Sequence, residues 1–223
     1  MNKLSVVSRA RGLRLLACSL VGFMWMLTAG CASLLPKPAP QASFYSLDGI
    51  ASTARTQPIA GSAAPTLVVS PPRAAAGYDS ARMLYSRGAH QLEYFAHNEW
   101  IDTPARMLAP LIVAAVENGN AFRAVIPTPS AAAGDIRLDT EILRLQQHFG
   151  GARSHVRFTL RAYVVDNATR RVLVSREFDE TVPATSEDPY GGVVAANRAV
   201  QNVLTALAAM CAEAVAGWQP PER

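Results

Sequence analysis

The fold is decided by residues 136–182, which read IRLDTEILRLQQHFGGARSHVRFTLRAYVVDNATRRVLVSREFDETV. Apolar and polar residues alternate along three segments of this stretch, which is the pattern of strands buried on one face. Turn residues separate the segments, around Gly150 and again at Asp166 and Asn167. The sequence therefore predicts an antiparallel meander of three strands joined by hairpins. The middle strand, residues 155–165, should turn five side chains inward: Val156, Phe158, Leu160, Ala162 and Val164.

The first strand of the meander changes the phase of its alternation partway along. Apolar or core-compatible residues occupy even-numbered positions from Ile136 to Ile142, and the alternation then passes to Leu143 and Leu145. This shift predicts a β-bulge, or a change in which face of the strand is covered.

Shorter segments before the meander indicate further strands and one helix. The expected strands cover residues 44–47, 66–70, 82–85, 91–95 and 121–126. The helix should run from Pro104 to about Asn118, with Asp102 or Thr103 as its cap. Pro110 lies inside it and should kink or locally unwind it, because proline removes one backbone hydrogen bond. The expected buried stripe of this helix is Met107, Leu108, Leu111, Ile112, Ala115 and Val116.

A second helix is expected over residues 188–217. Apolar residues recur there at spacings of three and four, which makes one continuous helical stripe. We expect this helix to pack on the sheet; alternatively, its alanine-rich outer side meets another subunit. Gly191 and Gly192 at its start are a weak signal for a phosphate cradle and more typical of a loop hinge. The stripe consists of Val193, Ala196, Val200, Val203, Leu207, Met210 and Ala214.

Together these elements predict a single α/β domain over residues 44–217, with a tail over residues 218–223. It should hold a mixed sheet with an antiparallel C-terminal meander and two main helices packed on the sheet.

Residues 1–30 are predicted to be an export signal. Four basic residues are followed by an uncharged apolar run over residues 15–30. This run is shorter than the roughly 20 residues that a membrane span needs, and it fits the apolar region of a signal peptide. Of the 21 basic residues these four are lost with the signal, which leaves 17 against 17 acidic ones. The basic balance of the chain therefore belongs to the signal, and nucleic-acid binding loses its main support.

The signal ends in Leu27-Thr28-Ala29-Gly30-Cys31, which resembles the bacterial lipobox. In that motif the cysteine thiol receives diacylglycerol and cleavage occurs just before it. Thr28 holds the place of the usual leucine. We expect diacylglycerol and an N-acyl chain on Cys31; the alternative is an ordinary signal peptide with an incidental cysteine. Ala32 in place of Asp resembles the sorting signal for the outer membrane.

Residues 31–43 are predicted to be a semi-extended tether, because they include three prolines and little that could pack: Pro36, Pro38 and Pro40. Cysteine use fits this plan. Cys18 would leave with the signal and Cys31 would be acylated, so the mature monomer cannot form a disulfide. The remaining Cys211 is expected to be a small buried hydrophobe in the last helix.

Chemistry-bearing motifs are sparse, and the chain is not expected to be an enzyme or to hold a metal or cofactor. His148 and His155 flank a hairpin tip and could face each other across two strands, but two histidines make a poor metal site. Phe149 at that tip is predicted to touch a partner or a neighbouring subunit. Trp100 is interpreted as a core anchor between helix and sheet, or alternatively as part of a partner interface.

The lipobox and several later segments, in this order, resemble the ABC-type transport auxiliary lipoprotein family, the PqiC-like lipoproteins. The segments are residues 44–47 (FYSL), 78–80 (YDS), 92–96 (LEYFA), 99–104 and 119–125 (GNAFRAV), followed by the strand around Phe178 and the alanine-rich last helix. The resemblance implies a non-enzymatic outer-membrane lipoprotein that faces the periplasm. It also implies work with an MCE-domain protein and an ABC permease and ATPase in lipid transport between membranes, and a possible homo-oligomeric ring.

The predicted function is therefore to dock an MCE assembly at the outer membrane. Two alternatives are a periplasmic lipid-binding chaperone, which needs a deep apolar cavity between sheet and helix, and a structural envelope lipoprotein without a transport role.

Overall fold

The computed structural model of the protein describes residues 41–48 and 64–219. The expected signal peptide, Cys31, Ala32 and the tether as far as residue 40 lie outside the described residues. Ser43, the last residue assigned to the tether, already belongs to the first strand. Among the helices of the described residues, none is both long and apolar enough to cross a membrane.

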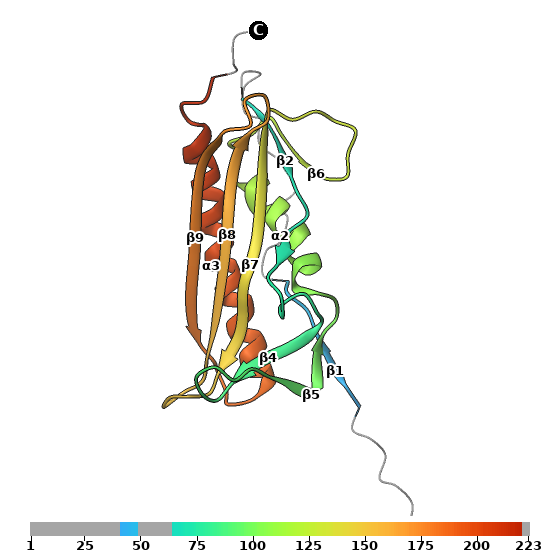
Figure 1. The fold of residues 1–223 in the computed structure, drawn as a ribbon, viewed down its shortest axis with the longest axis vertical. Helices are drawn as coiled ribbons and strands as arrows, with labels where there is room; N and C mark the ends of the chain where they lie inside the picture. The colour runs from blue at the N-terminus through green and yellow to red at the C-terminus, as the bar shows by residue number, and fades with distance from the viewer. Residues whose placement is uncertain (1–40, 49–63, 220–223) are drawn as a thin grey trace, which may run out of the picture. The chain divides into compact units, whose positions relative to one another are not determined.

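Three long strands form the meander that the sequence predicts (Figure 1). They are β7 (Ile136–His148), β8 (His155–Asp166) and β9 (Val172–Pro183). β8 is antiparallel to both neighbours over nearly its whole length. The five inward side chains expected on β8 are all buried, with exposed fractions of 2% or less. The meander is thus confirmed, because alternation over this length leaves only one face that can be covered.

The phase change in the first strand is a β-bulge, as expected. Ile142 pairs with Leu160 and Arg144 pairs with Thr159, so Leu143 is the extra residue. Even-numbered residues face the core before the bulge, and Leu145 faces it afterwards. The bulge therefore decides which side chains at the end of β7 point away from the core.

Three shorter strands share the other edge of β7, and all of them run parallel to it. They are β2 (Thr66–Val69), β3 (Arg73–Ala74) and β4 (Arg82–Ser86), which pair with β7 one after another along its length. The two-residue strand β3 was not expected from the sequence, because it follows a pair of prolines.

The sheet continues on both sides of these short strands. β6 (Ala124–Pro127) pairs with β2, and β5 (Glu93–Trp100) pairs with β4 and with β1 (Ser43–Tyr45). Within the described residues, nine strands thus form one mixed sheet, as predicted. β5 is longer than the expected strand over 91–95, because backbone pairing on both edges overrides its polar second half. β6 begins three residues later than expected.

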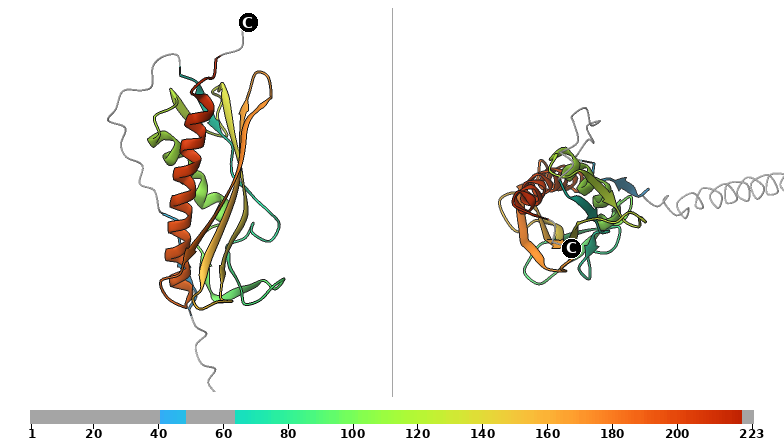
Figure 2. Two further views of the ribbon diagram at one scale, coloured as in Figure 1. Left: turned by 90° about the vertical axis from the view of Figure 1, so that its left-hand side faces the viewer. Right: turned by 90° about the horizontal axis from the view of Figure 1, so that it is seen from above.

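Two helices pack side by side on one face of the sheet (Figure 1). α2 (Pro104–Asn118) contacts β6 and β3, and α3 (Pro189–Val215) lies along β8 and β9. The left view of Figure 2 shows α3 extending along the meander. The predicted stripe of α2 is buried, and so is that of α3 except Ala214, which is half-buried. The packing of the last helix on the sheet is confirmed.

Pro110 does not interrupt α2, contrary to the prediction of local unwinding. The helix is continuous from Pro104 to Asn118. Pro110 is exposed, and so is Arg106, whose carbonyl loses its helical partner. Because this carbonyl lies on the solvent side, water can satisfy it and the helix continues past Pro110 without a break. The alternative, a kink at Pro110, stays a prediction.

Candidate functional site: a basic pocket at the end of the meander

A pocket of about 670 Å³ lies where the loop between β4 and β5 faces the end of the β7–β8 hairpin. This volume falls within the range of about 300–1,000 Å³ that is usual for ligand pockets. Six of its lining residues are arginine or histidine, whereas no Asp or Glu lines it. The pocket is therefore a concentration of potential positive charge. The six residues are Arg87, His90, Arg144, His148, His155 and Arg157.

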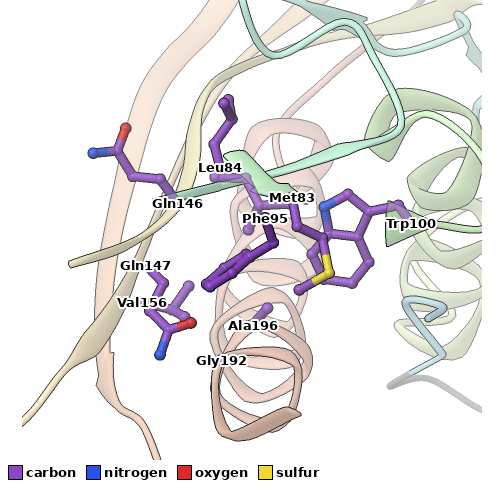
Figure 3. A pocket seen from close by; sticks show the side chains of 10 residues that line it. Met83, Leu84, Phe95, Trp100, Gln146, Gln147, Val156, Gly192 and Ala196 are labelled. Atoms are coloured by element: carbon purple, nitrogen blue, oxygen red, sulfur yellow. The ribbon is translucent and has the colours of Figure 1, made fainter. Parts of the chain in front are cut away.

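The bulge in β7 supplies one wall of this pocket. In an unbulged strand the even-numbered residues would have continued on the core face. Because the bulge absorbs Leu143, Arg144 and His148 lie on the outer face of the sheet, together with Gln146. Figure 3 shows Gln146 and Gln147 pointing to opposite sides of β7, with Gln147 on the side of α3.

β8 supplies the adjoining wall through direct cross-strand pairs. Gln146 lies opposite Arg157, and His148 lies opposite His155. The two imidazole rings are stacked, with centroids 5.0 Å apart and planes 15° from parallel. The prediction that these histidines face each other is confirmed. They do not form a metal centre with a third ligand: no cluster of three or more His, Cys, Asp or Glu side chains suited to a metal occurs among the described residues.

A chain of hydrogen bonds fixes the orientation of His148. The hydroxyl of Tyr78 donates to Gln146 Oε1, so the amide nitrogen of Gln146 points toward His148 Nε2, at 3.1 Å. That nitrogen must then be the acceptor, and the ring proton sits on Nδ1, which lies 2.8 Å from Ser86 Oγ. Ser86 Oγ accepts a hydrogen bond from this N–H group, so its own hydroxyl hydrogen is available to another acceptor.

The positive surroundings favour the neutral form of His148. Burial lowers the pKa of this ring below its ordinary value, and His155, Arg144 and Arg157 lower it further. The neutral state is also the one that the hydrogen-bond chain requires, since protonated imidazole has no acceptor for the Gln146 amide. The pocket thus combines fixed arginine charges with a histidine that is held uncharged.

The arginines of the pocket differ in how well their charge is compensated. Arg157 donates two hydrogen bonds to the carboxylate of Asp179, at 2.8 and 2.6 Å. Arg87 lies over the ring of Tyr85, 5.2 Å from its centroid, which is a weak compensation. No carboxylate of the described residues pairs with Arg87 or Arg144. Two of the three guanidinium groups therefore form no ion pair, although Arg144 lies near enough to Asp179 to help lower the pKa of that carboxyl.

An aromatic cluster supports the two loops beside the pocket. Phe149 makes edge contacts with Tyr85 and Phe95, at centroid distances of 5.7 and 6.2 Å, and is half-buried. Strands distant in sequence therefore supply a local core for this aromatic side chain. The predicted contact of Phe149 with a partner stays a prediction.

A small apolar pocket lies between the sheet and α3, and Trp100 lines it (Figure 3). The Trp100 side chain is only 5% exposed and belongs to the core, which agrees with its interpretation as an anchor. An interface role for Trp100 stays untested. The pocket has a volume of about 10 Å³, which is room for one water molecule at most. This space beside α3 is too small for an acyl chain, but a larger, mostly apolar pocket of about 420 Å³ lies between α2 and strands β2 and β6.

The glycine pair at the start of α3 is neither a hinge nor a phosphate cradle. Both residues lie in the first helical turn, where Asp188 accepts a hydrogen bond from the backbone N–H of Gly191 at 2.7 Å. A Cβ on Gly191 would lie 2.3 Å from the carbonyl oxygen of Ser186, and one on Gly192 would lie 2.2 Å from Gln147 Oε1. Glycine is needed at position 191 because the backbone of Ser186 passes too close for any side chain, whereas a side chain at position 192 would displace the end of Gln147.

Two residues near the C-terminus complete the domain at its other end. Cys211 is fully buried, and burial raises the pKa of its thiol to about 12, as suits a small core residue. Trp218 was assigned to the tail, yet its indole N–H donates to Asp166 at 2.8 Å. Neither residue lines the basic pocket.

Sequence reasoning found the paired histidines but missed the arginines around them. Arg144 and Arg157 each looked like ordinary outward residues of an alternating strand. The available signal was their position: both lie beside the predicted hairpin, on the face that carries the histidines. Arg87 and His90 could not have been added, because the pairing of β4 with β7 is not visible in the sequence.

Comparison with known proteins extends this description. The sequence model of the family described as "ABC-type transport auxiliary lipoprotein component" matches residues 45–208. Protein XCC0632 from Xanthomonas campestris has a similar structure, with a TM-score of 0.68 and 22% identity over 78% of this chain and 96% of that one. An uncharacterized protein gives a TM-score of 0.60 and 11% identity over 77% and 99% of the two chains.

A weaker similarity links the chain to the PelC dodecamer from Paraburkholderia phytofirmans, with a TM-score of 0.41 and 13% identity over 67% and 93% of the two chains. That likeness is too low to bear on the assembly of this chain. No curated protein sequence matches the chain. The structural matches therefore establish the fold alone, whereas the match to the family model also bears on function.

Proposed function

Because this chain belongs to the family of ABC-type transport auxiliary lipoprotein components, we propose that it docks an MCE-type lipid transport assembly at the outer membrane. Acyl chains on Cys31 hold it there, and the proline-rich tether sets how far the domain reaches into the periplasm. The domain then receives an MCE-domain protein that is linked to an ABC permease and ATPase. The protein itself catalyses no reaction in this scheme.

The observation that carries this proposal is the family match over the folded domain, joined to the lipobox that ends at Cys31. The family accounts for a membrane-anchored lipoprotein that serves an ABC-type transport system. Ala32 supports the outer membrane, since the aspartate associated with inner-membrane retention is missing. The MCE partner and a homo-oligomeric ring rest on the resemblance described above, and Phe149 is the proposed contact at the hairpin tip.

A lipid-binding chaperone is the weaker alternative. It needs a deep apolar cavity between sheet and helix. The pocket beside α3 has a volume of about 10 Å³, whereas a mostly apolar pocket of about 420 Å³ lies between α2 and strands β2 and β6. Lipid that co-purifies with the delipidated domain would favour this alternative. A structural envelope lipoprotein without a transport role predicts the same anchor but no transport partner. Partner identity therefore separates this second alternative from the proposal.

The decisive experiment isolates the tagged full-length lipoprotein from crosslinked cells and identifies its partners by mass spectrometry. We expect an MCE-domain protein and ABC subunits, with crosslinks near the β7–β8 loop if Phe149 lies at the interface. Cys31→Ser should move the protein from the outer-membrane fraction to the soluble periplasm, whereas Cys18→Ser, in the signal, should not. An MCE-free preparation, or an unchanged outer-membrane fraction for Cys31→Ser, would contradict the proposal.

A further inference from the structure

We infer that the basic pocket is a binding site for a phosphate group, carried either by a lipid headgroup or by a small soluble molecule. The site lies on the outer face of the β7–β8 hairpin and is closed on one side by the loop between β4 and β5. This inference concerns the pocket alone. It goes beyond the proposed function and requires neither the MCE partner nor a particular membrane.

The charge distribution is the first argument. Arg87 and Arg144 bring guanidinium groups to one cavity from two separate segments, and neither forms an ion pair with a carboxylate of the described residues. Arg144 acts on the Asp179 carboxylate only at longer range. Arg144 is half-buried beside His148, so its charge is only partly screened by water. A cavity lined by cationic side chains attracts anions more strongly than an isolated surface charge does. The pocket is thus built for a negative ligand.

The available hydrogen-bond donors are the second argument. Arg144 and Arg87 present planar forks of N–H groups, and Arg157 adds a third fork that is shared with Asp179. Ser86 accepts from His148 Nδ1 and is left with a free hydroxyl hydrogen. A tetrahedral oxyanion can accept from several such donors at once, whereas a carboxylate offers only two oxygens in one plane. The geometry therefore suits phosphate better than an acidic side chain.

The size and rim of the pocket are the third argument. A volume of about 670 Å³ exceeds what a bare phosphate ion needs and leaves room for the group attached to it. Leu92 lies on the rim and is 51% exposed, so an apolar surface adjoins the cations. A phosphate with an apolar extension would use both features.

Isothermal titration calorimetry on the mature chain carrying Cys31→Ser tests the inference. The compact unit begins after Gln41, so this change leaves the pocket untouched. The probes are inorganic phosphate and dihexanoyl phosphatidylglycerol, each below its aggregation limit. We expect saturable binding that Arg144→Gln weakens about tenfold or more, since one charge-assisted contact is lost. Arg87→Gln should weaken binding independently, from the opposite wall.

Arg198→Gln is the matched control, because it removes the same charge from an exposed position on α3 outside the pocket. Its affinity should equal that of the parent chain. Binding of both probes would indicate a general phosphate site, and binding of the lipid alone would assign the site to headgroups. Saturable binding of phosphate but not of the lipid would assign it to small solutes.

Two results would overturn the inference. One is the absence of saturable binding for both probes. The other is an equal loss of affinity in Arg144→Gln and Arg198→Gln, which would mean that net charge rather than the pocket attracts the anion. Neither result depends on whether an MCE protein is recovered from cells, so failure here and failure of the proposed function are distinguishable.

Discussion

The outer face of the meander is organised differently in its middle and at its hairpin end. In the middle, arginines are matched by carboxylates on the same or the next strand. Arg161 contacts Glu177 at 2.9 Å and Glu141 at 4.0 Å, and toward the opposite end of β7 Arg137 contacts Asp139 at 3.0 Å. At the hairpin end, Arg144 has no such partner among the described residues, and histidines take the places where acids would complete the pattern.

This difference separates charge that serves the fold from charge that is available to a ligand. Exposed ion pairs such as Arg161 with Glu177 contribute little stability, typically about 0.2–1 kcal/mol, but they leave no net potential on the surface. The hairpin end keeps more positive potential, because no carboxylate of the described residues forms an ion pair with Arg87 or Arg144. Arg157 lies at the boundary, since it lines the pocket and is also held by Asp179.

The largest effect is expected from placing a carboxylate in the pocket, because this would remove the difference between the hairpin end and the middle of the face. Gln146→Glu would introduce one negative charge next to Arg157 and His148, in a side chain that already accepts from Tyr78. We expect affinity for phosphatidylglycerol to fall by about tenfold or more, because the new anion occupies the donors. Thermal stability should fall, because the nearly buried side chain loses its amide donor to His148 Nε2 and takes on a charge. Calorimetric titration and a melting curve measure the two effects.

Gln201→Glu supplies the control for this substitution. Gln201 is exposed on α3 and contacts Arg198, so the chemical change is identical but lies outside the pocket. Its affinity should match that of the parent chain. If Gln146→Glu binds the lipid as tightly as the parent chain, the absence of a carboxylate is not the reason that the hairpin end binds an anion.

A smaller effect should follow when Arg157, at the boundary between the two regions, loses its carboxylate partner. Asp179→Asn removes the carboxylate that holds Arg157, so phosphate affinity should rise by a few fold while stability falls by about 0.2–1 kcal/mol. Hydrogen bonds from Arg157 lower the pKa of Asp179 from 3.8 to about 2. A lowered folded-state pKa stabilises the fold above the ordinary pKa, and this contribution is lost as pH falls from about 4 to about 2.

Chemical denaturation at pH 7 and at low pH measures that stability difference. It should be present at pH 7 and nearly absent at pH 2. Glu177→Gln, which releases Arg161 in the middle of the face, is the control for affinity. It should lower stability by a similar amount without tightening phosphate binding. Tighter binding in both variants would mean that any released arginine attracts the anion.

The sequence predicted the meander because its signal is local. Alternation along β8 leaves one possible buried face, and the two adjacent apolar residues Ile142 and Leu143 indicate the bulge. It could not predict the pocket, because two of its walls meet only through the parallel pairing of β4 with β7. The histidine pair was visible as a hairpin feature. Arg144 matters because it forms no ion pair with a carboxylate of the described residues, and the sequence alone does not show which charged side chains lie together in the fold.

The smallest expected effect concerns pH and tests whether the neutral histidine belongs to the site. Burial, followed by His155, Arg144 and Arg157, lowers the pKa of His148, and a bound anion would offset the arginines and raise it again. Binding should then take up a proton, so affinity for dihexanoyl phosphatidylglycerol should increase as pH falls from 7 to below about 6.5. The phosphodiester keeps one charge over this range, so the change would come from the protein. The gain should stay under tenfold, because the Gln146 amide must turn away from Nε2 to admit the proton.

The charged or titratable groups around the ring are Arg87 and His90 in the β4–β5 loop, Arg144 on β7, His155 and Arg157 on β8, and Asp179 on β9 behind Arg157. His148→Gln should reduce the pH dependence relative to the parent chain, whereas an unchanged profile would mean that His148 is not the group that takes up the proton.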